Sequence, residues 1–266
     1  MSDTTTTEKT RTNTQKPRRL LTQNSQLRAE GIFNFSLPAW AGRFADGSTY
    51  NACPEAGACA KLCYARVGTY RFPVVLAAHE RNMWMTMHAL ADWEAQMAEE
   101  IRHKRFRGKW IRLHDSGDFH SDEYLEAWLR IMRDAPEDTW FYCYTKSVSM
   151  FRRLVEPNPP KNFLWCYSLG GMEDHLLVLE GDRPDRHAEV FPSAEEVEAA
   201  GYTDQTESDL LSVLSESPKV GIPANRIPAL LKRQGSETFG SLQRALDKKI
   251  AEKRKRAAAR ALHLAS

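Results

Sequence analysis

The stretch Lys109-Trp-Ile-Arg-Leu-His-Asp-Ser-Gly-Asp-Phe119 and the segment after it, Ser121-Asp-Glu-Tyr-Leu-Glu-Ala-Trp-Leu-Arg-Ile-Met-Arg133, decide the fold. The first stretch is a predicted strand that runs into a polar loop. The second is a predicted helix, because Ser121 suits an N-cap and two acidic residues occupy the first turn. Thr139–Tyr144 is then a second apolar strand. A strand, a helix and another strand in this order are typical of a parallel sheet in an α/β protein.

The same alternation continues on both sides of this unit. Toward the N-terminus, residues 31–37 read as a strand, and residues 72–105 carry apolar side chains at helical spacing. Toward the C-terminus, a short helix is expected at 148–155, and strands at 162–168 and 219–222. We therefore predict an α/β fold with a mostly parallel sheet, open or curled into a partial (β/α) barrel.

Charge is distributed unevenly along the chain, although the formal net charge is only +2. Residues 1–28 are polar and basic and are expected to form a disordered leader. The predicted domain spans 29–235 and contains an acidic insert, 172–217, with thirteen acidic and two basic residues. Weak helices are expected in that insert near 193–200 and 207–214. Residues 236–266 are expected to form a basic helical tail, since 241–266 hold eight basic and two acidic residues.

Three of the five cysteines lie within eleven residues, in the segment Asn51-Ala-Cys-Pro-Glu-Ala-Gly-Ala-Cys-Ala-Lys-Leu-Cys-Tyr-Ala65. Thiolates at Cys53, Cys59 and Cys63 are soft ligands suited to zinc, copper(I) or an iron–sulfur cluster. Three ligands with no obvious fourth leave one coordination position open for a substrate or cofactor. This favours a catalytic metal site over a structural one. The alternative is that the three are reduced thiols packed as small apolar groups.

Polar residues follow each predicted strand and should line one cleft, because ligands bind at the carboxyl ends of parallel strands. Lys146 has an alternative role in pairing with a surface acid, and His114 is either a fourth metal ligand or a hydrogen-bonded rim residue. The Asp-Ser-Gly-Asp run at 115–118 is also good turn chemistry. Besides the cysteines, the candidate ligand-binding residues are Ser116, Gly117, Asp118, Lys146, Ser168 and Asn225.

Several of these motifs together resemble the "gene product eighty-eight" family of phage and mobile-element proteins, over about residues 21–240. They are the Cys53–Ala65 segment, Ile111–Phe119, Tyr144-Thr-Lys146 and Tyr167-Ser-Leu-Gly-Gly171. More distantly, the layout resembles radical S-adenosylmethionine enzymes, whose three cysteines hold a [4Fe–4S] cluster after the first strand of a partial barrel. That resemblance implies that Ser116-Gly117-Asp118 holds the cofactor's amino group. The usual spacing there is Cys-x3-Cys-x2-Cys, whereas this chain has Cys-x5-Cys-x3-Cys.

Three functions follow as hypotheses. The first is an iron–sulfur, radical S-adenosylmethionine-like enzyme; the second is a zinc protein, either hydrolytic or structural. The third is an accessory protein that binds nucleic acid through the basic tail, although that tail could instead face the acidic insert of the same chain. No apolar run reaches the length of a membrane span, no signal peptide precedes the domain, and clustered cysteines argue against disulfides. We therefore expect no membrane partner and a cytoplasmic location.

Overall fold

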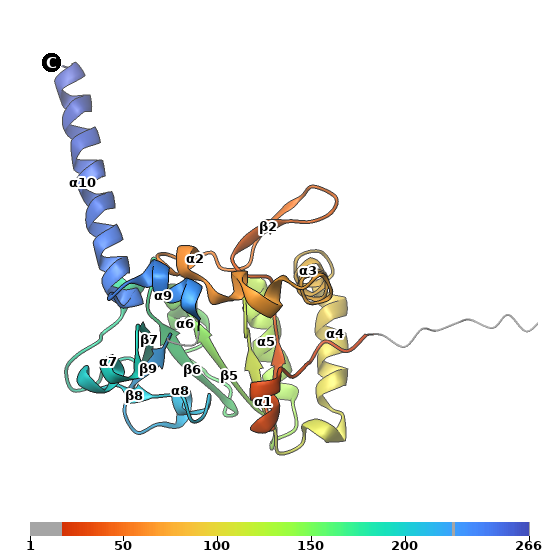
Figure 1. The fold of residues 1–266 in the computed structure, drawn as a ribbon. Helices are drawn as coiled ribbons and strands as arrows, with labels where there is room; N and C mark the ends of the chain where they lie inside the picture. The colour runs from red at the N-terminus through yellow and green to blue at the C-terminus, as the bar shows by residue number, and fades with distance from the viewer. Residues whose placement is uncertain (1–17, 225–226, 266) are drawn as a thin grey trace, which may run out of the picture.

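The computed structural model describes residues 18–224 and 227–265 and contains a seven-stranded, parallel sheet (Figure 1). The strands lie side by side in the order β1-β4-β5-β6-β7-β9-β8. Their bounds are β1 Phe33–Phe35, β4 Trp110–Leu113, β5 Trp140–Thr145, β6 Phe163–Ser168, β7 His187–Phe191, β8 Thr203–Asp204 and β9 Lys219–Pro223. The predicted α/β fold with a mostly parallel sheet is confirmed. A barrel is not confirmed, because β1 and β8 form open edges among the described strands.

Three amphipathic helices cover one face of the sheet: α4 (Leu90–Ile101), α5 (Asp122–Asp134) and α6 (Val148–Leu154). Helix α5 begins as its sequence predicts, with the Ser121 hydroxyl accepting a hydrogen bond from the Tyr124 amide at 3.3 Å. The larger core lies between these helices and the sheet, and its centre is a group of fully buried aromatic rings that includes Trp93 and Trp128. Helix α3 (Pro73–His88) packs beside α4, so the expected helical region before β4 forms two helices.

The opposite face of the sheet is covered by two short helices, α1 (Ser25–Ala29) and α8 (Leu211–Leu214), over a smaller apolar cluster. Helix α1 lies inside the segment that we expected to be a disordered leader. That expectation is wrong for residues 18–28, because Leu20 and Leu21 are buried and Thr22 pairs with Asn34 of β1. Residues 1–17 lie outside the described part of the chain. Order therefore begins earlier than the polar composition suggested.

The acidic segment 172–217 is not an appendage to the sheet. It contributes β7, which lies between β6 and β9, and the edge strand β8. The expected helices are present as α7 (Ala194–Ala199) and α8, and a short 3-10 turn, η4, spans Asp174–Leu176. Strand β7 escaped prediction because it carries Glu189, whose buried carboxylate is satisfied from outside the strand by the Gly240 amide at 3.1 Å.

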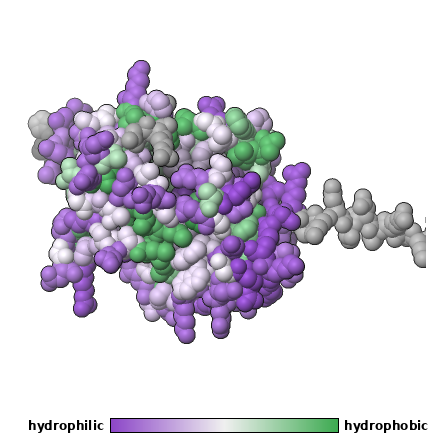
Figure 2. Space-filling view, turned by 60° about the horizontal axis from the view of Figure 1, so that its bottom comes forward, coloured by the Kyte–Doolittle hydropathy of each residue, from purple (hydrophilic) through white to green (hydrophobic). Residues whose placement is uncertain are grey.

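The cysteine segment and the C-terminal helices gather at one end of the sheet (Figure 1). Helix α10 (Phe239–Ala265) rises from this end and projects away from the domain, so the expected C-terminal helix is present. The opposite end, turned forward in Figure 2, is mostly hydrophilic around a small apolar area. The other elements are β2 Ala41–Arg43, β3 Thr49–Asn51, α2 Cys59–Leu62, η1 Tyr64–Arg66, η2 Gly68–Arg71, η3 Lys104–Phe106 and α9 Pro228–Gln234. Among the described helices, none is both long and apolar enough to cross a membrane.

Candidate functional site

A cavity of about 410 Å³ opens at the carboxyl ends of the parallel strands. The cysteine loop forms one wall, and the ends of β4, β5, β6 and β9 form much of the rest, together with residues near α1, after β8 and in the C-terminal helices. Every described residue that the sequence marked as a ligand lines it: Cys53, Cys59, Cys63, His114, Ser116, Gly117, Asp118, Lys146 and Ser168. Asn225 lies outside the described residues. The structure thus brings together side chains that are more than one hundred positions apart in the sequence.

The cysteine loop is clamped between the β6 end and helix α10. The Cys59 amide donates to the Gly170 carbonyl at 3.1 Å, and the Ala58 amide donates to Gln243 Oε1 at 2.6 Å. A side chain at Gly57 would meet Gln243, since a Cβ there would lie only 1.9 Å from Oε1. A larger residue at this position would therefore displace the Gln243 side chain from the Ala58 amide. The clamp holds the cysteines at the cavity wall.

All five cysteines are free thiols, and three of them meet at the cavity. A hydrogen bond from the Cys63 thiol lowers the pKa of Cys59 to about 6, and the nearby charge of Lys146 acts in the same direction. That same bond raises the pKa of Cys63, while burial raises the pKa of Cys53. Cys59 is thus the thiol most easily ionised. Within residues 18–224 and 227–265, no three His, Cys, Asp or Glu side chains surround a single ion position.

Asp118 and Lys146 join the ends of three strands into one polar ledge. Asp118 Oδ1 accepts from the Thr145 hydroxyl and the Phe119 amide, and Oδ2 accepts from the Lys146 amide, each at 2.8 Å. Lys146 Nζ donates to the Ser168 carbonyl, the Ser168 hydroxyl and the Leu169 carbonyl, also at 2.8 Å each. Lys146 therefore does not pair with a surface acid. Burial raises the pKa of Asp118, and its hydrogen bonds oppose this shift.

His114, Ser116 and Gly117 shape the loop after β4. The backbone of His114 has a φ of 63°, in the left-handed region that costs a residue with a side chain free energy. Its Nε2 lies 2.8 Å from the Tyr124 hydroxyl, its buried Nδ1 has no partner among the described residues, and burial lowers its pKa to about 3. Gly117 lies so close to Leu37 that a Cβ would approach within 2.6 Å. A metal-binding role for His114 remains a prediction.

The sequence did not reveal a second group of polar side chains in the cavity, here called the inner pocket: Tyr64, Tyr70, Arg112, Asp115, Tyr144 and Asp209. Arg112 Nη1 lies 3.3 Å from Asp115 and 3.2 Å from Asp209, and the guanidinium stacks over the Tyr144 ring with 5.1 Å to its centre. Tyr70 donates to Asp115 at 2.9 Å, and Tyr64 donates to the Asp115 carbonyl. One signal was present: Arg112 is a charge inside an otherwise apolar strand.

Comparison with known proteins identifies the family. The family model described as "Gene product 88" matches residues 7–261, nearly the whole chain. This chain belongs to the Gene product 88 family. Two relatives are the "Gene 88 protein" of Mycobacterium phage L5, 34% identical over 104 residues, and that of Mycobacterium phage D29, 33% identical over 104 residues. Each match covers 36% of this chain. It spans less than half of each relative, 43% of the L5 protein and 42% of the D29 protein.

No solved structure matches this member of the Gene product 88 family. The family resemblance predicted from the cysteine, strand-end and Gly-Gly motifs is confirmed by the family match. The more distant resemblance to radical S-adenosylmethionine enzymes finds no support in these comparisons. It therefore rests on the layout of the fold and the cavity alone.

Proposed function

We propose that this protein is an iron–sulfur enzyme of the radical S-adenosylmethionine type. The observation that carries the proposal is the convergence of three free thiols with the polar ends of β4, β5 and β6 in one cavity. The cysteine loop follows the first strand of a sheet whose strands β1 to β9 lie in chain order, except for the edge strand β8. Free cysteines suit the reducing cytoplasm, where we place the protein.

The donor set at the cavity fits a [4Fe–4S] cluster. Three thiols supply three soft ligands and leave one iron without a protein ligand. A cluster attaches each thiolate to a different iron, so its ligands need not surround one central point as the ligands of a single zinc ion do. The lowered pKa of Cys59 favours the thiolate that ligation requires. Zinc bound by the same thiols, with His114 or solvent, is the alternative.

Cys53, Cys59 and Cys63 would hold the cluster, and Ser116, Gly117, Asp118, Lys146 and Ser168 line the space beside it. When bound, a cluster and S-adenosylmethionine together supply hydrogen abstraction from unreactive carbon positions. The charged side chains of the wall are three carboxylates and two cations, namely Asp115, Asp118, Asp209, Arg112 and Lys146. This excess of negative charge complements the sulfonium and ammonium groups of that cofactor. Lys146 and Asp118 would position the cofactor through the ledge that they hold rigid.

Single cysteine substitutions test the proposal. After anaerobic reconstitution, Cys53→Ala, Cys59→Ala and Cys63→Ala should each lose the cluster, which holds roughly four irons per chain in the unchanged protein. Cys143→Ala and Cys166→Ala are matched controls, because both thiols lie buried within strands β5 and β6 and do not line the cavity. Iron and sulfide analysis measures the result. Stoichiometric zinc without iron in the anaerobic protein would contradict the proposal.

We also infer that helix α10 binds nucleic acid. All its residues from Lys248 to Arg260 are exposed, including seven of the eight basic residues that the helix contains. No ion pair among the described residues involves these cations, so the alternative of a clamp onto the acidic segment gains no support from salt bridges. Unpaired lysine and arginine side chains on an isolated helix suit phosphate contacts that are indifferent to sequence.

Deleting residues 252–266 tests this second function. The deletion removes only exposed side chains among those described, so we expect weaker binding to single-stranded DNA at low salt with an unchanged melting temperature. Its control reverses the charges of Lys104 and Lys161, which are exposed elsewhere on the domain. Unchanged affinity after the deletion would show that α10 is not the binding arm. A fall in melting temperature alone would favour the internal clamp.

A further inference from the structure

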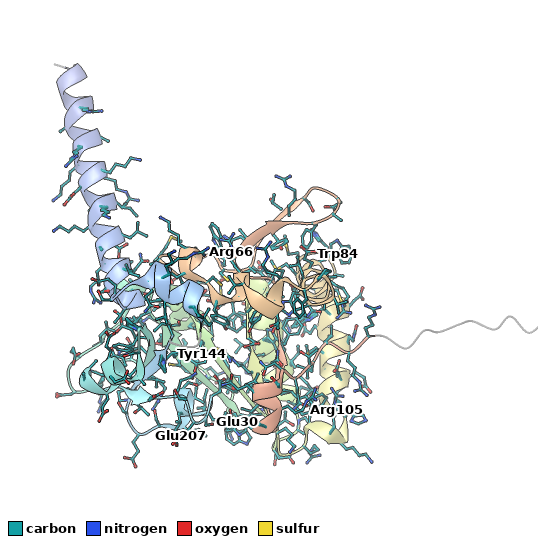
Figure 3. All side chains as sticks on the ribbon, in the orientation of Figure 1. Glu30, Arg66, Trp84, Arg105, Tyr144 and Glu207 are labelled. Carbon is teal, nitrogen blue, oxygen red and sulfur yellow. The ribbon has the colours of Figure 1, made fainter. Side chains whose placement is uncertain are left out.

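The mouth of the cavity, on the outer side of the cysteine segment, has three exposed cations, whereas the cavity wall has more carboxylates than cations. Inside, the wall has three carboxylates against two cations. Outside, the segment from Ala56 to His79 contains Lys61, Arg66 and Arg71 and no acidic residue, and all three cations are exposed. Figure 3 shows Arg66 at the end of the molecule that carries α2 and α10, whereas Tyr144 lies deeper in the domain. Lys61, Arg66 and Arg71 can therefore contact phosphates at this end of the molecule. The carboxylates of Glu55 and Asp174 also lie beside the cysteine loop, so these contacts come from the individual cations.

The basic helix α10 starts at this same mouth. Phe239, its first residue, lines the cavity, and Gln243 in its second turn holds the Ala58 amide of the cysteine loop at 2.6 Å. From Arg244 onward the exposed cations of α10 lead away from the mouth. A polyanion that follows the helix toward the domain must therefore arrive at the opening of the cavity.

The inner pocket offers what a nucleobase needs. Tyr64 and Tyr70 form an aromatic pair with ring centres 5.6 Å apart, and Tyr144 contributes a third ring. Bases stack on such rings whatever their sequence. The buried Nε of Arg112 has no hydrogen-bond partner within the described part of the chain, and neither has Nδ1 of His114. The cavity of about 410 Å³ falls within the range of small-molecule sites, roughly 300–1,000 Å³.

We propose that the substrate is a strand of nucleic acid that inserts one nucleotide into the inner pocket. Its phosphates lie outside, along α10 and the exposed cations of the mouth, and its base lies inside, against the tyrosines and beside the cysteines. The cations of α10 contact the anionic backbone, and the aromatic interior takes the uncharged base. This assignment names the substrate class of the enzyme proposed above and rests on that proposal.

The test compares two single-stranded probes of equal length and charge, a labelled oligothymidylate and the same backbone built of abasic residues. We expect the unchanged protein to bind the intact probe at least about fivefold more tightly, since stacking of one base is worth ~1–3 kcal/mol. Fluorescence anisotropy at low salt measures both affinities. Equal affinities would overturn the proposal, because contacts to phosphate alone do not distinguish the two probes.

Two aromatic substitutions locate the base. Tyr70→Ala should lower the affinity for the intact probe toward that for the abasic probe and leave the abasic affinity unchanged. Trp84→Ala is the matched control, because Trp84 is 45% exposed on α3 and does not line the cavity. If Trp84→Ala lowers the ratio of intact to abasic affinity and Tyr70→Ala does not, the base binds outside the pocket and the proposal fails. Should Tyr70→Ala not fold, the ratio in the unchanged protein still decides.

Iron is measured on the same samples, which separates this assignment from the proposed enzyme. A preference for the intact probe in protein that cannot take up iron would overturn the iron–sulfur proposal and support the nucleic-acid site. A full cluster with equal affinities for the two probes would overturn the nucleic-acid site alone.

Discussion

The two walls of the cavity are built in opposite ways. The sulfur wall, Cys53, Cys59 and Cys63, comes from one loop, and its three cysteines are free thiols, of which Cys63 donates a hydrogen bond to Cys59. The inner pocket joins Arg112 to Asp209 across 97 positions of the chain, and each of its charges already has a partner. The three thiols of the sulfur wall are therefore free to bind a metal, whereas the charges of the inner pocket already pair with one another and only Arg112 Nε is left without a partner among the described residues. The cavity thus combines thiols that can bind a metal with an inner pocket held rigid by its own ion pairs.

Removing Arg112 should give the largest loss of stability. Arg112→Met leaves the carboxylates of Asp115 and Asp209 without their shared cation at a site where the side chains are 4–14% exposed. Breaking a buried ion pair from one side costs about 3–5 kcal/mol. Urea unfolding measures the change, with Cys53→Ala in the metal-free protein as the comparison from the sulfur wall. If Cys53→Ala proves as costly as Arg112→Met, the contrast between the walls is wrong.

Asp118→Asn should cost less, about 1.5–3 kcal/mol, because an amide cannot accept all three hydrogen bonds that the carboxylate receives. The three hydrogen bonds join protein groups only, so the loss of stability should be present without any cofactor. Chemical unfolding checks the expected loss, and Glu123→Gln, on the exposed start of α5, serves as the control. Unchanged stability with weakened S-adenosylmethionine binding would show that Asp118 serves the ligand alone.

Gln243→Ala should cost about 1–2 kcal/mol and act on the sulfur wall only. The substitution leaves the buried Ala58 amide without its acceptor. Amide hydrogen exchange should accelerate at Ala58 and in the cysteine loop but not in β4 or β5. Arg244→Ala, one residue further along α10 and exposed, is the control. Uniform acceleration across the sheet would mean that the two walls are not independent.

The smallest effect is expected at an exposed ion pair, Asp122 and Arg153, whose side chains do not line the cavity. The hydrogen bond from Arg153 lowers the pKa of Asp122, so this pair stabilises the folded state above the usual carboxyl pKa and the contribution is lost as the pH falls. Arg153→Ala should therefore lower the melting temperature slightly at neutral pH and not at about pH 2. Thermal unfolding across this range checks the sign. A difference that grows toward low pH would contradict it.

The sequence predicted the sulfur wall because its three cysteines lie in one short segment, and the ledge because its residues directly follow apolar strands. It failed where partners come from distant parts of the chain. Arg112 is a single charge in an apolar strand, and its partner Asp209 lies in the distant acidic segment. Strand β7 does not resemble a core strand in sequence, because it contains Glu189, whose donor Gly240 lies on α10. Leu20 and Leu21 were too few to mark the start of order within a polar leader. Local patterns thus predicted β1, β4, β5, β6 and β9 and the polar residues at their ends, but neither β7 and β8 nor the non-local pairs.

Anaerobic purification followed by an absorption spectrum with iron and sulfide analysis decides whether the three cysteines hold an iron–sulfur cluster. We expect a brown protein with the broad visible absorption of such a cluster and roughly four irons per chain. That cluster should require all of Cys53, Cys59 and Cys63. A colourless protein that holds zinc, or that takes up no iron during reconstitution, would contradict this expectation.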